Sequence, residues 1–221
     1  FKEYKIDGVI NFAAETHVDN SIKKPAIFIN SNINGVFNLL NTCYKFWMKG
    51  PFSYKKFFKY SRFHQISTDE VYGSITDGSF SEKSPYKPNS PYSSSKASAD
   101  MIVRSFNKTY GLNTTISISS NNFGKNQNKE KLLPKIIKCI KNDEKISIFG
   151  DGLNERDWVF VRDNCRAIDL IYEDGNSGEK YNVGSGKSIS NIELVKYILN
   201  LVCKDDMIKF VEYRYGHDFR Y

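Results

Sequence analysis

Residues 63–70 read Phe-His-Gln-Ile-Ser-Thr-Asp-Glu and indicate the fold class most clearly. Residues 63–67 have the pattern of a β-strand, and the polar cluster Thr68-Asp69-Glu70 follows at once. Residues 9–13 form a similar segment, a short apolar run that ends in small residues. Such a run is typical of a buried parallel strand, and this one leads into a loop at 15–21. Both segments predict strands whose carboxyl ends hold functional loops.

The segments between these strands have helical periodicity. Apolar residues recur at three- and four-residue spacing after Pro25 and predict a long helix that fades by Trp47. A second helix is expected over 92–110, and a third strand over 114–119, where β-branched residues alternate. Alternating strands and helices predict an α/β fold with a doubly wound, mainly parallel sheet of Rossmann type. Ligands bind beyond the carboxyl ends of the strands in such sheets.

Beyond Gly124 the predicted elements become shorter. They predict a smaller α/β lobe over 125–221 that caps the sheet. Its expected helices cover 132–141, 163–172 and 191–202, and its expected strands cover 146–149 and 180–183.

Composition restricts the possible function classes. The 221 residues carry a formal net charge of +7, spread along the chain, which favours anionic small ligands over nucleic acid. The four cysteines are far apart and only three histidines accompany them, so we expect no metal site and no disulfide framework. Isolated thiols are typical of the cytoplasm. No apolar run is long enough to span a bilayer, and no membrane contact is expected.

The two ends of the sequence predict a fragment. The chain opens at Phe1 without an initiator Met and moves directly into the first strand, as if it began within a domain. Residues 218–221 carry no closing helix or strand pattern, so the second end is also expected to be cut.

Tyr92 and Lys96 are four residues apart, so on a helix they share one face and the ammonium lies near the phenol. A free phenol has a pKa near ~10 and is a poor base at neutral pH. A neighbouring cation and a positively charged nicotinamide both favour the phenolate, which can accept a proton from a sugar hydroxyl as hydride leaves the same carbon. An isolated pair of this kind is usually a surface feature. This pair opens a helix after the turn-rich residues 88–91, which favours the catalytic interpretation.

Asp69 and Glu70 are adjacent carboxylates at a predicted strand end. Two charges are costly there unless their surroundings separate their pKa values, in which case one group donates a proton and the other accepts one. Thr68 adds a hydroxyl that can hydrogen-bond to a substrate oxygen. The alternative is a loop with a solvated acidic pair.

These residues resemble the extended short-chain dehydrogenases and, within them, the dTDP-glucose 4,6-dehydratases. The resemblance covers residues 7–221. The Thr-Asp-Glu triplet discriminates best, because epimerases of the superfamily lack both carboxylates and decarboxylases usually keep only the Glu. The most specific matching stretches are Ala13 to Asp19, Ile66 to Gly73, Pro91 to Ser98 and Ser120 to Gly124.

The resemblance implies a redox-neutral dehydration that uses NAD. Tyr92 is expected to deprotonate the 4-hydroxyl while C4 gives hydride to NAD, and Lys96 to lower the pKa of Tyr92 and hold the nicotinamide ribose. Glu70 is expected to remove the C5 proton, Asp69 to protonate the departing 6-hydroxyl, and Thr68 to hydrogen-bond to the 4-oxygen. The stored hydride then returns to C6.

The resemblance also implies binding residues by position. NAD is expected to contact Phe12, Ala13, Ala14, Thr16, Ser31, Tyr92, Lys96 and Asn122. The nucleotide sugar is expected to contact Thr16, Asn121, Lys131, Leu132, Ile148, Phe149, Arg156, Asn182, Arg214 and His217. Residues 1–124 are then the C-terminal part of the NAD-binding domain with the catalytic groups, and residues 125–221 mainly bind the nucleotide sugar. A homodimer built on the helices at 25–47 and 92–110 is expected.

Two features depart from the family pattern. The glycine-rich phosphate loop and the acidic residue that follows it by about 20 residues are absent from these 221 residues. The family's Asp-Arg-Pro-Gly-His is replaced by Tyr213-Arg214-Tyr215-Gly216-His217. The first departure removes the seat for the adenosine half of NAD, and the second alters a loop expected to contact the nucleotide.

Two other motifs are interpreted as incidental. Residues 184–188, Gly-Ser-Gly-Lys-Ser, resemble the end of a P-loop, but the required first glycine is Tyr181. The basic and aromatic run from Trp47 to Phe63 is typical of nucleic-acid or membrane contact, but a variable surface insertion explains it better.

Three hypotheses remain open from the sequence. The first is an NAD-dependent 4,6-dehydratase, with dTDP and UDP sugars not distinguished. The second is a 4-epimerase or decarboxylase of a UDP-sugar in the same family. The third is a truncated, non-catalytic binding module.

Overall fold

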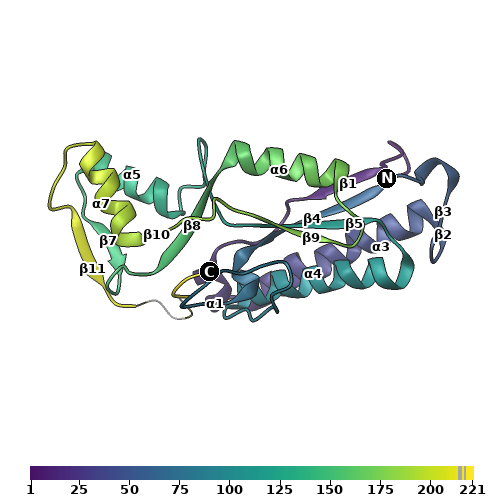
Figure 1. The fold of residues 1–221 in the computed structure, drawn as a ribbon, viewed down its shortest axis with the longest axis horizontal. Coiled ribbons are helices and arrows are strands. Elements are labelled where there is room, and N and C mark those ends of the chain that lie inside the picture. The colour runs from purple at the N-terminus through teal and green to yellow at the C-terminus, as the bar shows by residue number, and fades with distance from the viewer. Residues whose placement is uncertain (214–215, 217) are drawn as a thin grey trace.

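A parallel sheet forms the larger part of the molecule (Figure 1). The computed structural model describes residues 1–213, 216 and 218–221. The sheet has the strand order β1 (Gly8–Asn11), β4 (Arg62–Thr68), β5 (Thr114–Ser119) and β9 (Lys180–Val183), and every pairing is parallel. Helices α3 (Gly35–Trp47) and α4 (Pro91–Tyr110) cover one face and α6 (Val161–Asp174) covers the other. The predicted α/β fold with a parallel sheet is confirmed.

The helix expected after Pro25 is interrupted. It forms as α2 (Pro25–Phe28), a wider π-helical turn η1 (Ile29–Asn34) and α3 (Gly35–Trp47). A short additional helix, α1 (Val18–Lys23), begins inside the expected loop at 15–21. It starts there because the ring nitrogen of His17 accepts a hydrogen bond from the amide of Asn20 at 3.4 Å.

Helix α4 (Pro91–Tyr110) matches its prediction closely, because its two ends are encoded locally. The Ser90 hydroxyl accepts from the amide of Ser93 at 3.1 Å, and the Ser93 hydroxyl accepts from the amide of Ser90 at 3.1 Å. This capping box fixes the helix start one residue before Tyr92. Gly111 ends the helix in the left-handed conformation, with φ of 71°.

A second, smaller part of the molecule has its own core. It contains a sheet of β10 (Ser188–Ser190), β8 (Glu155–Phe160) and β6 (Asn121–Phe123), and a parallel pair of β7 (Ile146–Phe149) and β11 (Ile208–Val211). Helices α5 (Leu132–Asn142) and α7 (Asn191–Leu201) pack with this pair around a separate apolar cluster. Its buried members are Ile136, Ile146, Ile148, Val195, Leu199 and Met207.

The chain crosses between the two parts more than once. Helix α6 and strand β9 return to the large sheet although both follow residue 124. The division at residue 124 therefore stays a prediction about binding roles, and it does not describe the layout of the sheet.

The aromatic and basic run after Trp47 folds as a hairpin, β2 (Met48–Gly50) and β3 (Ser53–Tyr54), followed by the turn η2 (Lys56–Phe58). Trp47 is fully buried and donates from its indole to the carbonyl of Ile6 at 2.7 Å. Phe58 is also buried, whereas Phe52, Phe57 and Tyr60 are exposed. Part of this run therefore builds the core. Among the described residues, no helix has the length and apolarity that crossing a membrane requires.

Candidate active site

Strand β4 delivers the polar triplet to the edge of the sheet. Thr68 ends the strand, and its hydroxyl accepts from the amide of Glu70 at 3.4 Å to start the 3₁₀ turn η3 (Asp69–Tyr72). Gly73 follows with φ of 83°, and a Cβ there would lie 2.1 Å from the carbonyl oxygen of Lys87. Only glycine fits this turn, so the backbone holds both carboxylates at the strand end.

Helix α4 presents Tyr92 and Lys96 to the same place. Both side chains are buried, with 8% and 5% of their surface exposed. The ammonium of Lys96 donates to the carbonyl of Ile66 at 2.6 Å, two residues before Thr68. The ring of Tyr92 packs edge-on against Phe28, with 6.4 Å between ring centroids.

The five predicted catalytic residues come together around these two elements. Burial raises the pKa of Tyr92, the charge of Glu70 raises it further, and a side-chain hydrogen bond with Thr68 lowers it. Burial also raises the pKa of Asp69 well above its usual range, and Glu70 adds to this effect. Burial is the largest cause of the raised Tyr92 pKa and the charge of Glu70 is the next, so the expected lowering of this pKa by Lys96 stays a prediction.

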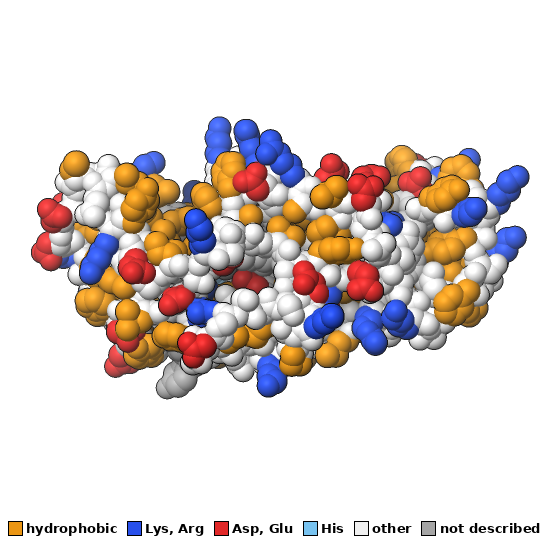
Figure 2. Space-filling model, viewed as in Figure 1, with side chains coloured by type: hydrophobic (Ala, Val, Ile, Leu, Met, Phe, Trp, Pro, Cys, Tyr) orange, Lys and Arg blue, Asp and Glu red, His pale blue; other side chains and the backbone are white. Residues whose placement is uncertain are grey.

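A cavity of about 350 Å³ opens beside the triplet. Asp69 and Tyr72 line it from η3, Ser120 lines it after β5, and Asn182 lines it from β9. Tyr72 donates from its hydroxyl to the side-chain oxygen of Asn182 at 2.8 Å. Figure 2 shows one face of the molecule hollowed near its middle, with acidic side chains in and around the hollow. The carboxyl ends of β4, β5 and β9 therefore meet at a pocket of ligand size.

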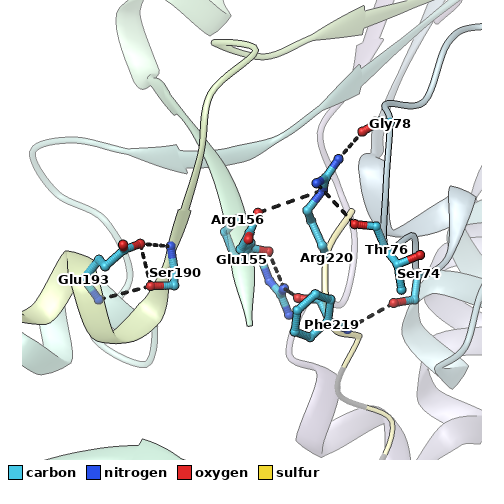
Figure 3. A network of polar contacts seen from close by, with 9 residues as sticks. All are labelled: Ser74, Thr76, Gly78, Glu155, Arg156, Ser190, Glu193, Phe219 and Arg220. Atoms are coloured by element: carbon cyan, nitrogen blue, oxygen red, sulfur yellow. Dashed lines mark hydrogen bonds and ion pairs between the residues drawn. The ribbon is translucent and has the colours of Figure 1, made fainter. Parts of the chain in front are cut away.

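Arg220 and Tyr221 of the C-terminal segment line one side of this cavity. Figure 3 shows the polar contacts that hold this segment. Phe219 donates its amide to the Ser74 hydroxyl at 3.1 Å, and the Arg220 guanidinium reaches the carbonyls of Thr76 and Gly78. On the other side the carbonyl of Phe219 accepts from the amide of Glu155 at 2.8 Å. Residues 219 and 220 thus join the loop after η3 to strand β8.

Arg156 is tied to the same segment. Its guanidinium donates to the carbonyls of Glu155, Asp218 and Phe219 at 2.6, 2.9 and 3.1 Å. It also lies 4.1 Å from the ring centroid of Tyr221. Its expected contact with a diphosphate stays a prediction, since the chain's own carbonyls take much of its donor capacity.

Tyr221 is a site residue that sequence reasoning missed. It lines the cavity, burial raises the pKa of its phenol well above the usual range, and the charge of Glu70 adds to this. Nothing in the sequence near residue 221 predicts an element, so only the folded chain brings this phenol to the carboxylates.

Asn32 is a second missed residue, and it lies in the π-helical turn. It is 1% exposed, and its amide donates to the Ser95 hydroxyl at 2.8 Å and to the Glu15 carbonyl at 3.0 Å. Its side-chain oxygen accepts from the Glu15 amide at 2.8 Å. Asn32 therefore ties the loop after β1 to helix α4. The break in regular helical geometry at 29–34 is not visible in the apolar spacing.

The remaining predicted binding residues occupy several positions around the site. Lys131 donates to the carbonyl of Thr16 at 3.2 Å, which connects the two parts of the molecule. The Asn122 amide donates to the carbonyl of Ser120 at 3.2 Å, and Asn121 is its half-buried neighbour on β6.

Arg214 and His217 lie outside the described residues. Phe12, Ala13, Ser31 and Phe149 are exposed, Ala14 and Leu132 are half-buried, and Ile148 is buried in the second core.

In the P-loop-like stretch at 184–188, hydrogen-bond donors are paired with an acceptor from the same chain. The carboxylate of Asp157 accepts from the Ser185 amide at 3.0 Å, the Ser185 hydroxyl at 2.7 Å and the Gly186 amide at 2.8 Å. A P-loop directs such donors to phosphate, whereas here a carboxylate takes them. Among the described residues, His, Cys, Asp and Glu do not gather in any group of three or more able to bind a metal ion.

Comparison with known proteins assigns the family. The family profile described as GDP-mannose 4,6 dehydratase matches residues 1–215. The chain belongs to this family. It is 45% identical to the low-salt glycan biosynthesis protein Agl12 of Haloferax volcanii, over 97% of this chain and 66% of that protein. It is 43% identical to the dTDP-glucose 4,6-dehydratase of Neisseria meningitidis, over 100% of this chain and 65% of that enzyme.

A solved structure agrees with this family assignment. The chain superposes on DesIV, a dTDP-glucose 4,6-dehydratase from Streptomyces venezuelae with NAD and TYD bound, with a TM-score of 0.90 and 38% identity. The match covers 98% of this chain and 64% of DesIV. The resemblance to dTDP-glucose 4,6-dehydratases and the Rossmann-type fold are both confirmed. The chain spans slightly less than two thirds of the length of these three relatives.

Proposed function

We propose that this chain carries the catalytic and substrate-binding residues of an NAD-dependent enzyme that converts dTDP-glucose to dTDP-4-keto-6-deoxyglucose. The observation that carries the proposal is the meeting of two carboxyl groups, Asp69 and Glu70, with the buried Tyr92 and Lys96 at the end of one strand, where Asp69 lines a cavity. Of these four side chains, oxidation of a hydroxyl group by NAD needs only the Tyr and the Lys. Elimination of water needs an acid and a base in addition.

Asp69 suits the role of the acid. Its raised pKa keeps the carboxyl protonated at higher pH than an ordinary Asp, so it can donate a proton to the departing 6-hydroxyl. Glu70 is then the base that removes the C5 proton. The short 3₁₀ turn holds both groups on one substrate, which lowers the entropic part of the barrier.

Tyr92 is the proposed base for the 4-hydroxyl. Burial and the charges of the surrounding carboxylates both favour its neutral phenol, so a compensating positive charge is needed for the phenolate to form. Lys96 supplies one such charge from the next turn of the helix. Thr68 is proposed to share its hydroxyl between Tyr92 and the 4-oxygen of the sugar.

NAD is the proposed cofactor, and the residues present fit its nicotinamide end. When bound it would take up the hydride from C4 and return it at C6. Small side chains, Ala13 and Ala14, follow strand β1 at the carboxyl end of the sheet. The side-chain oxygen of Asn122 is buried and lacks a hydrogen-bond partner among the described residues, so it can accept from a carboxamide.

The substrate is proposed to lie across the cavity towards the smaller part of the molecule. Asn182 and the C-terminal segment border the space, and Lys131 holds Thr16 nearby. The further expected contacts at Arg156 and at residues 214 and 217 also belong to this proposal.

A homodimer is proposed for this protein. Helices α3 and α4 lie side by side on one face of the sheet, and Phe37 and Met101 are 44% and 59% exposed on them. A cytoplasmic location is proposed from the four free thiols.

The first test identifies the reaction product. The protein, expressed from its complete gene, is incubated separately with dTDP-glucose, UDP-glucose and UDP-glucuronate, and the products are identified by NMR. We expect a 4-keto-6-deoxy sugar from dTDP-glucose. A 4-epimer or a pentose product would contradict the proposal and indicate epimerisation or decarboxylation.

Glu70→Gln tests the proposed base. We expect dehydration to slow by about 10²-fold or more, because a general base of this kind contributes roughly 10²–10⁴ to the rate. The exposed Glu179→Gln is the matched control and should keep full activity. Unchanged turnover in Glu70→Gln would contradict the assignment of Glu70 as the base that removes the C5 proton.

A further inference from the structure

Asp100 is a buried carboxyl group that the proposed mechanism does not use. It lies one helical turn beyond Lys96 on α4 and is 2% exposed. One of its oxygens accepts from the Ser67 hydroxyl at 2.5 Å and from the Tyr86 hydroxyl at 3.1 Å. Its other oxygen, Oδ1, has no hydrogen-bond partner among the described residues. A buried carboxylate with one unpaired oxygen is costly, so its presence needs a compensating interaction.

A cation lies one turn away on the same helix face: the ammonium of Lys96 donates to the carbonyl of Ile66, the residue before the Ser67 that binds Asp100. Burial raises the pKa of Asp100 to about 6, and Lys96 is the strongest of the charges that lower it. Burial lowers the pKa of Lys96, and the charge of Asp100 raises it. Each group therefore favours the ionised form of the other, and burial opposes both.

The other groups that face Asp100 do not replace this pairing. Tyr86, on the loop before α4, and Tyr72, on η3, are phenols whose pKa values are raised, so they remain neutral donors. Lys180 on β9 also lowers the pKa of Asp100, but less than Lys96 does. Its ammonium lies 4.1 Å from the ring centroid of Tyr86 and 5.1 Å from that of Tyr72.

We propose that Asp100 is a positioning residue that keeps Lys96 protonated and directed towards the catalytic strand end. The proposal rests on the proposed function, in which Lys96 acts as a cation beside Tyr92. Asp100 is anchored from strand β4 by Ser67, the residue before Thr68, and from the loop before α4 by Tyr86. Its charge is thus fixed relative to the elements that carry the catalytic groups, and it acts through Lys96 without touching substrate.

The test removes the charge of Asp100 and keeps the shape of its side chain. In Asp100→Asn we expect Lys96 to lose its proton at lower pH, so the alkaline limb of the pH profile of kcat should move down by about one pH unit. At pH values on that limb, kcat should fall roughly tenfold while KM changes little. The exposed Asp169→Asn on α6 is the matched control and should leave the profile unchanged.

A second measurement does not depend on activity. Lysine side chains are labelled with ¹³C at Cε, the Lys96 signal is assigned with Lys96→Arg, and its titration midpoint is followed by NMR. We expect the midpoint in Asp100→Asn to lie about one pH unit below that of the unmodified protein. Asp100→Ser, a smaller neutral variant, serves the same test if the Asn variant does not fold.

The outcomes separate the two proposals. A midpoint of Lys96 that does not move in the neutral variants overturns the role of Asp100, whatever the activity. If the unmodified protein forms no dehydration product but the midpoint moves, the proposed function fails and the electrostatic coupling stands. Asp100→Glu should restore the midpoint, because it restores the charge.

Discussion

The carboxyl group of Asp69 lies where burial and a neighbouring carboxylate both favour its protonated form. Two adjacent carboxylates in one turn cannot both be ionised without a large repulsive cost. In the proposed mechanism, Asp69 in its protonated form is the acid and Glu70 is the base, and the two act on neighbouring carbons of the same sugar. Tyr221 from the C-terminal segment and Arg156 from strand β8 complete the polar surroundings.

Asp69→Asn should separate the elimination from the earlier steps. An amide cannot protonate the leaving hydroxyl, so we expect product formation to slow by about 10²–10⁴-fold. Oxidation at C4 and removal of the C5 proton by Glu70 should continue. In D₂O, sugar recovered from the Asn variant should therefore contain deuterium at C5, as NMR will show. Full product formation by this variant would contradict the assignment of Asp69 as the acid.

At this scale the sequence predicted the groups that share a local pattern. Tyr92 and Lys96 are one helical turn apart, so their spacing alone places them on one helix face. Asp69 and Glu70 are adjacent in the chain, so the sequence alone places them in one turn. Asp100 is also four residues from Lys96, yet its burial depends on Ser67 and Tyr86 from other elements. Asn32 and Tyr221 were missed for the same reason, because tertiary contacts alone bring them to the site.

Strand β4 lies inside the large sheet, paired with β1 on one side and β5 on the other. His64 on β4 is fully buried and bridges to β5, with 2.8 Å from Nδ1 to the Thr115 hydroxyl and 3.0 Å from Nε2 to the Ser117 hydroxyl. Burial is the main reason that the pKa of His64 falls from 6.5 to about 4, and the charge of Arg62 contributes. The sheet therefore holds this imidazole neutral between two hydroxyls.

This neutral histidine makes the stability of the fold depend on pH. Between pH 6.5 and about 4 the unfolded chain binds the proton and the folded chain does not, so the free energy of unfolding falls as pH falls. The loss attributable to His64 is about 3 kcal/mol over this window. In His64→Gln we expect a weaker acid dependence by up to that amount, measured by urea unfolding at several pH values. If the unmodified protein and His64→Gln lose stability equally as pH falls, His64 is not the cause of the acid dependence.

Element boundaries were predictable where their ends are encoded locally, as at Ser90 and Gly111 around α4. The π-helical turn at 29–34 was not, because apolar spacing reports which face is buried and does not report a widened turn. Strands β6 and β10 were also missed because each has only three residues. Strand β8 was missed although it has six.

The whole molecule brings the site together from distant parts of the chain. The loop after β1, the turn after β4, the start of α4 and the C-terminal segment all contribute, and the Lys131 to Thr16 contact joins the two parts. On the face of the sheet that carries α3 and α4, exposed apolar side chains remain available for a second copy of the chain.

Met101→Glu tests the proposed dimer. A charge buried without a partner costs about 3 kcal/mol or more, so we expect the dimer dissociation constant to rise by at least ~100-fold. Sedimentation velocity measures this change, and circular dichroism checks that the monomer remains folded. The control is Leu170→Glu on α6, which covers the opposite face of the sheet and is 63% exposed. A dimer that tolerates Met101→Glu would place the interface elsewhere.

The return of strand β9 to the large sheet has a consequence for synthesis on the ribosome. Strand β5 ends at Ser119, but its partner β9 begins only at Lys180, after most of the smaller part has been made. Until then β5 presents a bare edge on which other chains can pair. Translation proceeds at about 5–20 residues per second, so this edge stays open for several seconds in every nascent molecule. While residues 120–180 are being added, the growing chain therefore exposes an edge that chaperone binding would protect.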